Sequence, residues 1–142
     1  MRWKGRRHRA LIRRYQNHFS TGIQTTQRAM LELTRNYCTD VGGQLLTVRS
    51  FPSWLYMIDH GATTICERWD GYVRGRGFQD AGMNSFIHWA FGAGGEWLWR
   101  NIARLNPDDA QPGWKHFVIA PKPGGGVTCA KGEYQSIRRR IV

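Results

Sequence analysis

The spacing of apolar positions predicts helices in the first half of the chain. Within residues 17–36, apolar side chains recur at helical intervals, at Ile23, Ala29, Met30 and Leu33. Ser20 or Thr21 precedes this pattern and would cap the helix. The glycines of residues 40–43 indicate a break after it, and residues 44–48 fit either a second helix or a strand.

Two more helices are expected further along the chain. The first follows Pro52, a residue that suits the first turn of a helix, and it ends at Gly61. The second covers residues 83–105, where the helical period is clearest. Asn84 or Ser85 would cap this second helix.

The pattern changes to short extended runs after Pro107 and Pro112. Strands are expected within residues 114–120, 127–130 and 134–142. Helices followed by consecutive short strands indicate a chain that is mainly α with a β C-terminal part.

The composition excludes a disordered chain and a membrane span. The chain is 41% hydrophobic and contains seven Trp, which is enough apolar surface to form a core. No run reaches the roughly 18 to 20 apolar residues that a membrane span needs. The basic start lacks the apolar stretch of a secretory signal, so we expect a cytoplasmic protein by default, with secretion of a longer parent protein left open.

Neither a metal nor a cofactor is expected. Cys38, Cys66 and Cys129 are widely spaced and odd in number, so they indicate neither a disulfide framework nor a zinc site. The glycines at 75–77 and 124–126 match neither a phosphate-binding loop nor a dinucleotide fingerprint.

The positive charge lies mainly at the two ends of the chain. The net charge is +11, and seven of the 21 basic residues fall within residues 2–14. Removing these seven leaves 14 basic against 10 acidic residues, an ordinary balance. A basic nucleic-acid-binding module is therefore an alternative function and not the leading one.

The segment TTICERWDGY, residues 63–72, holds the best candidate for chemistry. It lies within a long glycine-punctuated stretch, and loops of such length are usually functional or disordered. Glu67 in this segment can serve as a general base, and a nearby Arg68 or His60 would favour its charged form. The alternative is an ordinary loop glutamate that pairs with Arg68.

His88 and several tryptophans are weaker candidates. His88 can hydrogen-bond a substrate hydroxyl, or it can be a satisfied core residue. Indole rings can stack on the C–H face of a sugar, although most tryptophans at helical spacing belong to a core. The tryptophans that could include such a platform are Trp54, Trp69, Trp89, Trp97 and Trp99.

Four segments together resemble the bacterial α-L-rhamnosidases of glycoside hydrolase family seventy-eight. They occur in collinear order and cover nearly everything from about residue 17 onward. The segments are HFSTG at 18–22, FPSWLYMIDHGATTICERWDG at 51–71, MNSFIHWAFGAGGEWLWRNIARL at 83–105 and PGWKHFVIAPKPGGGVTCAKGEY at 112–134.

The resemblance implies a partial (α/α)6 barrel followed by the first strands of a β-sandwich domain. The expected division is a basic, unassigned segment at 1–16, the C-terminal part of a six-hairpin glycosidase domain at 17–110 and the start of the β-sandwich at 111–142. The implied activity is the inverting hydrolysis of terminal α-L-rhamnose from rhamnosides, without a metal.

The resemblance also assigns site residues. Glu67 matches the family's water-activating glutamate, and His88 matches a histidine that lines the sugar pocket. Trp54 and Trp69 lie in matching segments and are expected to contact substrate. Inversion requires a second carboxyl group, roughly 6.5 to 9.5 Å away, that protonates the leaving oxygen.

The chain departs from the family pattern at three places. Cys66 stands where Trp is usual, and Ile87 stands where Asn is common. The acidic motif that holds the family's general acid has no counterpart in these residues. We therefore expect a C-terminal fragment that is inactive alone and needs the missing part of the catalytic domain. A non-catalytic carbohydrate-binding remnant is a further alternative.

Overall fold

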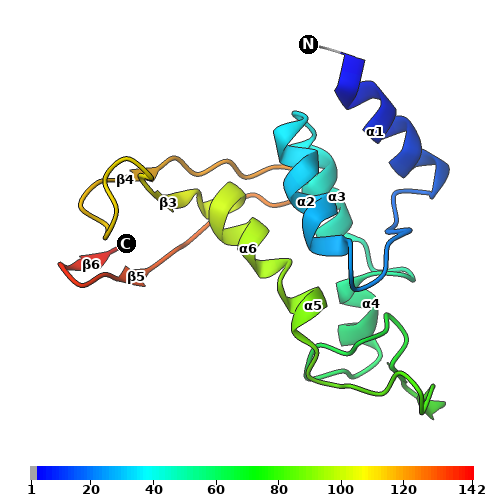
Figure 1. Ribbon diagram of the computed structural model, residues 1–142. Coiled ribbons are helices and arrows are strands. Elements are labelled where there is room, and N and C mark those ends of the chain that lie inside the picture. Colours follow the sequence, from blue (N-terminus) through cyan, green and yellow to red (C-terminus); the bar gives the residue numbers. More distant parts are fainter. Residues whose placement is uncertain (1–2) are drawn as a thin grey trace.

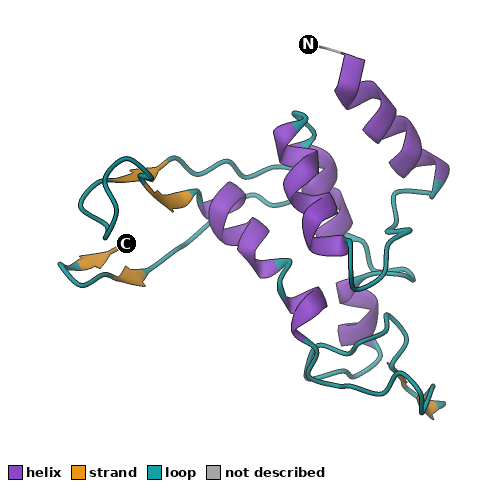
Figure 2. Cartoon of the chain, in the orientation of Figure 1, coloured by secondary structure: helices purple, strands orange, loops and turns teal. Residues whose placement is uncertain are grey.

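The computed structural model describes residues 3–142 and shows a helical part followed by β-hairpins (Figures 1 and 2). The helices are α1 (Trp3–Arg14), α2 (Thr26–Arg35), α3 (Thr39–Thr47), α4 (Trp54–Asp59), α5 (Trp89–Gly92) and α6 (Gly95–Trp97), which continues into a π-helical turn at Leu98–Ala103. The expected mainly α chain with a β C-terminal part is confirmed. No described helix has both the length and the apolar character needed to cross a membrane.

The described strands form three antiparallel pairs. In chain order these are β1 (Tyr72–Val73) with β2 (Gly77–Phe78), β3 (Leu105–Pro107) with β4 (Phe117–Ile119), and β5 (Tyr134–Gln135) with β6 (Arg140–Ile141). The β1–β2 hairpin lies within the loop between α4 and α5, and the other two pairs follow the last helix. Residues 127–130 form no strand, so that part of the strand prediction was wrong.

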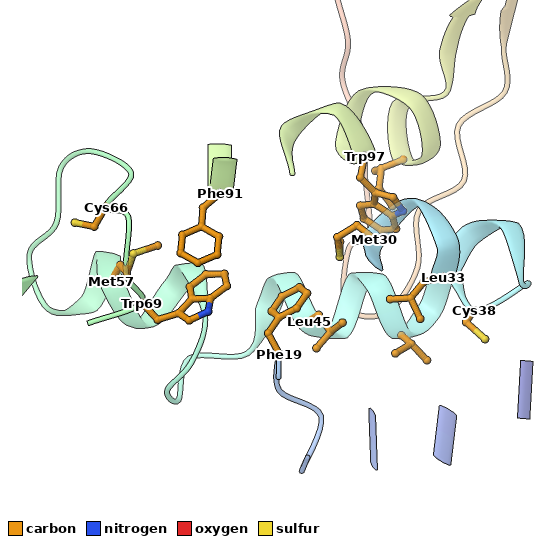
Figure 3. Close-up of a cluster of buried hydrophobic side chains, with 12 residues drawn as sticks. Phe19, Met30, Leu33, Cys38, Leu45, Met57, Cys66, Trp69, Phe91 and Trp97 are labelled. Carbon is orange, nitrogen blue, oxygen red and sulfur yellow. The ribbon is translucent and has the colours of Figure 1, made fainter. Parts of the chain in front are cut away.

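The helical part is held together by a buried cluster of aromatic and aliphatic side chains (Figure 3). Trp97 is 1% exposed and Met30 is fully buried, and the two lie together where α6 meets α2. The indole Nε1 of Trp97 donates to Thr34 Oγ1 at 2.7 Å, which satisfies the one polar group of this ring. Burial of such rings is worth about 1.5–3 kcal/mol each and supplies most of the stability of small helices.

Helix α1 is tied to α3 by a bidentate ion pair. Arg9 donates from Nη1 and Nη2 to the two carboxylate oxygens of Asp40, at 2.6 and 2.8 Å. These bonds, ahead of all other contributions, hold the pKa of Asp40 below its usual range. Residues 3–14 of the basic, unassigned start form this helix.

The predicted break after α2 occurs at residues 36–38 and not at the glycines of residues 40–43, because helix α3 runs through these glycines. The reason is close packing. A β-carbon on Gly42 would lie 2.6 Å from Trp97 Cζ2, and one on Gly43 would overlap the carbonyl oxygen of Gly124. Glycine is therefore used here for close approach and not for a turn.

Helix starts were also predicted inaccurately. The N-cap of α2 is Thr25, whose side chain makes no cap bond, and Thr21 instead hydrogen-bonds Thr26 Oγ1 at 2.9 Å. Helix α4 is capped by Ser53, whose hydroxyl accepts from the backbone N–H of Tyr56. The expected helix over 83–105 begins only at Trp89, and it is interrupted at residues 93–94, between α5 and α6.

Candidate functional site

Two stretches of the α4–α5 loop pair through their backbones. Glu67 N donates to Ser85 O at 2.8 Å, and His88 N donates to Ile65 O at 2.8 Å. The hydroxyl of Thr64 also donates to the carbonyl oxygen of Phe86. These bonds fix the glutamate segment against the residues that lead into α5.

The pairing brings Glu67 and His88 together. Glu67 Oε1 lies 4.0 Å from His88 Nε2, and the two side chains are 20% and 23% exposed. Glu67 Oε2 accepts from the backbone N–H of Ser85 at 3.3 Å. Oε1 has no hydrogen-bond donor within the described part of the chain, so one oxygen orients the carboxylate and the other stays available.

His88 is the N-cap residue of α5, which fixes the position of its ring proton. Its Nδ1 accepts from the backbone N–H of Ala90 at 3.2 Å, so Nδ1 carries no hydrogen. The neutral ring therefore carries its proton on Nε2, the atom that faces Glu67. The start of the helix thus presents a hydrogen-bond donor next to a carboxylate.

Arg68 does not pair with Glu67. Its guanidinium binds Asp70 at 2.9 Å and Asp80 at 2.9 Å, and the bond to Asp70 is the main cause that raises the pKa of Arg68. The alternative of a loop glutamate paired with Arg68 was therefore wrong. His60 is also engaged elsewhere, because its Nδ1 lies 2.9 Å from Tyr56 O and its ring lies against the Tyr56 ring.

Cys66 precedes the candidate base in the sequence and is 2% exposed. Burial raises the pKa of its thiol, although a backbone bond from Tyr72 opposes this effect. A β-carbon on Gly71 would lie 2.8 Å from Cys66 Cβ, so the chain turns tightly around this residue. Cys66 also borders a hollow of about 280 Å³ that Tyr72, Phe78 and Phe86 help to line.

Trp54 and Trp69 belong to the aromatic core. Trp69 is 8% exposed and stacks on Phe91, with ring centroids 3.8 Å apart (Figure 3). Trp54 forms T-shaped ring pairs with Phe19 and Trp69, with ring centroids 5.1 and 5.3 Å apart. Trp54 is only partly buried, and the contact of either ring with sugar stays a prediction.

Trp89 has the exposed ring that Trp69 lacks. Its side chain is 75% exposed, and its ring lies nearly parallel to that of His88, with centroids 6.5 Å apart. The sequence placed Trp89 among five candidates, and only its position directly after His88 could have singled it out. Among the described residues, no group of three or more His, Cys, Asp or Glu side chains could hold a metal ion.

Comparison with protein families gives two matches along the chain. The model of the bacterial α-L-rhamnosidase six-hairpin glycosidase domain matches residues 3–102. The model of the bacterial α-L-rhamnosidase C-terminal domain matches residues 105–142. The first match includes residues 3–16, which the sequence motifs do not cover.

Curated relatives carry the same name. An α-L-rhamnosidase of Streptomyces avermitilis is 47% identical over 128 residues, which cover 90% of this chain and 12% of the relative. An α-L-rhamnosidase of Formosa agariphila is 40% identical over 114 residues, or 80% of this chain and 12% of the relative. The chain thus spans only a small part of the relatives that it matches.

Solved structures have the same fold over this region. The Streptomyces avermitilis α-L-rhamnosidase complexed with L-rhamnose matches with a TM-score of 0.84 and 44% identity, over 96% of this chain and 13% of that one. The α-L-rhamnosidase of Aspergillus terreus matches with a TM-score of 0.85 and 29% identity, over 98% of this chain and 16% of that one. The expected combination of six-hairpin helices and a C-terminal β part is confirmed.

Proposed function

Because this chain belongs to the bacterial α-L-rhamnosidase family, we propose that it carries the water-activating half of an inverting rhamnoside hydrolysis. Glu67 is the general base, and His88 contacts the sugar. The observation that supports this assignment is the Glu67–His88 pair, with 4.0 Å between Oε1 and Nε2. The substrate is a terminal, non-reducing α-L-rhamnose residue of a rhamnoside.

Each group has a defined part in the reaction. A water molecule attacks the anomeric carbon while Glu67 Oε1 takes one of its protons. The glycosidic C–O bond breaks, and a carboxylic acid elsewhere protonates the leaving oxygen. The Ser85 N–H holds Oε2, so the carboxylate is oriented before the substrate arrives.

His88 suits a binding role next to this base. Its Nε2–H can donate to a hydroxyl of the sugar, because Nδ1 is already occupied by the start of α5. A donor whose orientation is fixed in advance loses little freedom on binding. The exposed ring of Trp89 lies beside it and can cover the sugar face.

The chain contributes no residue that we assign as the general acid. Asp70 and Asp80, the next two acids after Glu67 in the sequence, are both bound to Arg68. We therefore expect these 142 residues alone to release no rhamnose from an aryl rhamnoside. Domain boundaries at residues 16 and 110 remain part of this proposal.

A chimera tests the assignment. Residues 17–142 replace the matching part of the Streptomyces avermitilis α-L-rhamnosidase, and hydrolysis of p-nitrophenyl α-L-rhamnoside is followed. Glu67→Gln, which keeps an acceptor for Ser85, should lower kcat by about 10²–10⁴-fold. Proton NMR should show β-L-rhamnose as the first product.

Glu133→Gln, which changes an exposed glutamate paired with Arg140, is the control. A Glu67→Gln chimera that is as active as this control would overturn the proposal.

A further inference from the structure

A second hollow lies away from the Glu67–His88 pair, between the helices and the C-terminal segment. It has a volume of about 470 Å³ and is lined by residues of both parts, among them Tyr37, Asp40, Asn101, Arg104, Lys122 and Gly124. A volume of this order suits a small ligand such as a sugar.

The walls of this hollow are fixed by backbone contacts. The segment after β4 runs back to α3 and then returns to β5 (Figure 1). Lys122 N donates to Ile102 O at 2.9 Å, which ties this segment to the π-helical turn. Gly124 and Gly125 pack so closely on Gly43 and Asp40 that no β-carbon would fit at Gly43 or Gly125. The hollow is therefore formed before any ligand enters.

Two bulky residues at its rim have an unfavourable backbone. Tyr37 has φ 60° and Arg104 has φ 49°, both in the left-handed region. Tyr37 follows the last residues of α2, where its N–H donates to Thr34 O and the N–H of Cys38 donates to Leu33 O. Glycine is the residue that such a helix end prefers. A tyrosine that is 75% exposed at this position costs stability and gains no burial.

The polar groups of the hollow favour a negatively charged ligand. The side-chain Nδ2 of Asn101 is buried and, among the described residues, is the one such atom without a hydrogen-bond partner. Buried amide donors without a partner are rare in native proteins. Arg104 and Lys122 add two positive charges, whereas the carboxylate of Asp40 is neutralised by Arg9.

We propose that this hollow binds a sugar that carries a negative charge, a carboxylate or a sulfate group. The Lys122 and Arg104 side chains take the charged group beside the buried Asn101 amide, and the ring of Tyr37 covers the sugar face. This site is separate from the Glu67–His88 pair and does not depend on its function.

Titration of the 142-residue chain with four probes tests the proposal. D-Glucuronate and glucose 6-sulfate carry the charge on a sugar, glucose lacks the charge, and inorganic sulfate lacks the sugar. Side-chain amide signals of ¹⁵N-labelled asparagine should show Asn101 shifting with at least one charged sugar. That sugar should bind at least about tenfold more tightly than glucose or sulfate, the equivalent of one charge-assisted hydrogen bond. Binding of D-glucuronate would identify the charged group as a carboxylate, and binding of glucose 6-sulfate would identify it as a sulfate.

Variants separate binding from folding. Tyr37→Gly should raise or preserve thermal stability, because glycine suits φ 60°, and should weaken binding of the charged sugar at least about tenfold. Lys122→Gln should also weaken binding, and Lys131→Gln is the matched control. An unmoved Asn101 signal, equal affinity for sulfate and the sugars, or unchanged binding in Tyr37→Gly would overturn the proposal. The Asn101 signal is read in the unmodified chain, so this result holds even where a variant does not fold.

Discussion

His88 Nδ1 accepts the backbone N–H of Ala90, and this bond leaves His88 Nε2 facing Glu67 Oε1 at 4.0 Å. One side chain thus starts a helix and completes a candidate site. Its two nitrogens have different tasks, and substitutions can separate them.

His88→Asn should keep the cap and lose the donor that faces Glu67. Asparagine is a preferred N-cap residue, whereas alanine has no acceptor, so His88→Ala should lower the free energy of unfolding by about 1 kcal/mol relative to His88→Asn. Urea unfolding of the chain measures this difference. In the chimera, both variants should lose rhamnoside hydrolysis. Equal unfolding midpoints for the two variants would show that the cap contributes nothing.

Gly42→Ala should destabilise the protein because the new methyl group would lie 2.6 Å from the Trp97 ring. Trp97 is 1% exposed and bound to Thr34, so it has no room to move away. The expected loss is about 1–3 kcal/mol of unfolding free energy. Gly95→Ala is the control, since nothing lies within 4 Å of its β-carbon, and it should change stability little or increase it by up to about 1 kcal/mol. A Gly42→Ala protein as stable as the control would contradict the close packing of Gly42 on Trp97.

The Arg9–Asp40 pair should make stability depend on acid pH. Arg9 holds the pKa of folded Asp40 below its usual value, so the pair stabilises the fold above the ordinary carboxyl pKa of about 3.9. This contribution is lost as the pH falls through the lowered pKa. Both side chains are partly exposed, at 37% and 48%, so the effect should stay below about 1 kcal/mol.

Asp40→Asn should remove that part of the pH dependence. Unfolding free energies between neutral pH and about pH 2 would show it as a shallower slope. Asp109→Asn, an exposed aspartate in the loop between β3 and β4, serves as the comparison and should retain the slope of the unmodified chain. Identical slopes for both variants would exclude a role for the pair.

Cys66→Trp restores the residue that the family pattern usually has at this position. The hollow of about 280 Å³ beside Cys66 can accept the larger ring, so the thermal midpoint should stay equal or rise. Gly71→Ala adds only one methyl group but places it 2.8 Å from Cys66 Cβ, and it should lower stability by about 1–3 kcal/mol. A larger loss in Cys66→Trp than in Gly71→Ala would show that the hollow does not accommodate the indole.

The sequence was sufficient for a helical part followed by short strands and for the loop that carries Glu67. The alternative that paired Arg68 with Glu67 was wrong, because nothing near Arg68 in sequence reveals that Asp80 binds this side chain. The breaks in helices were misjudged for a similar reason. Gly42 and Gly43 resemble breakers until Trp97 and Gly124, which are distant in sequence, pack on them.

Candidate sugar contacts were the least predictable. Trp54, Trp69 and Trp89 have the same chemistry, and only the fold shows that Trp89 is exposed while Trp69 is stacked on Phe91. Motif position indicated which segments matter. Motif position could not indicate which side of each segment faces the core. The helix expected from residue 83 begins only at Trp89, so its expected period does not apply to the residues before it.

The close approach of Gly43 to Gly124 has a consequence for how such proteins can evolve. One glycine lies in the part that matches the six-hairpin domain, and the other lies in the part that matches the C-terminal domain. Recombination between two related genes at the junction of these two parts would inherit the two glycines from different parents. Exchange of these parts is therefore expected to succeed only between parents that both leave room for this contact, so the two domains are inherited as a matched pair.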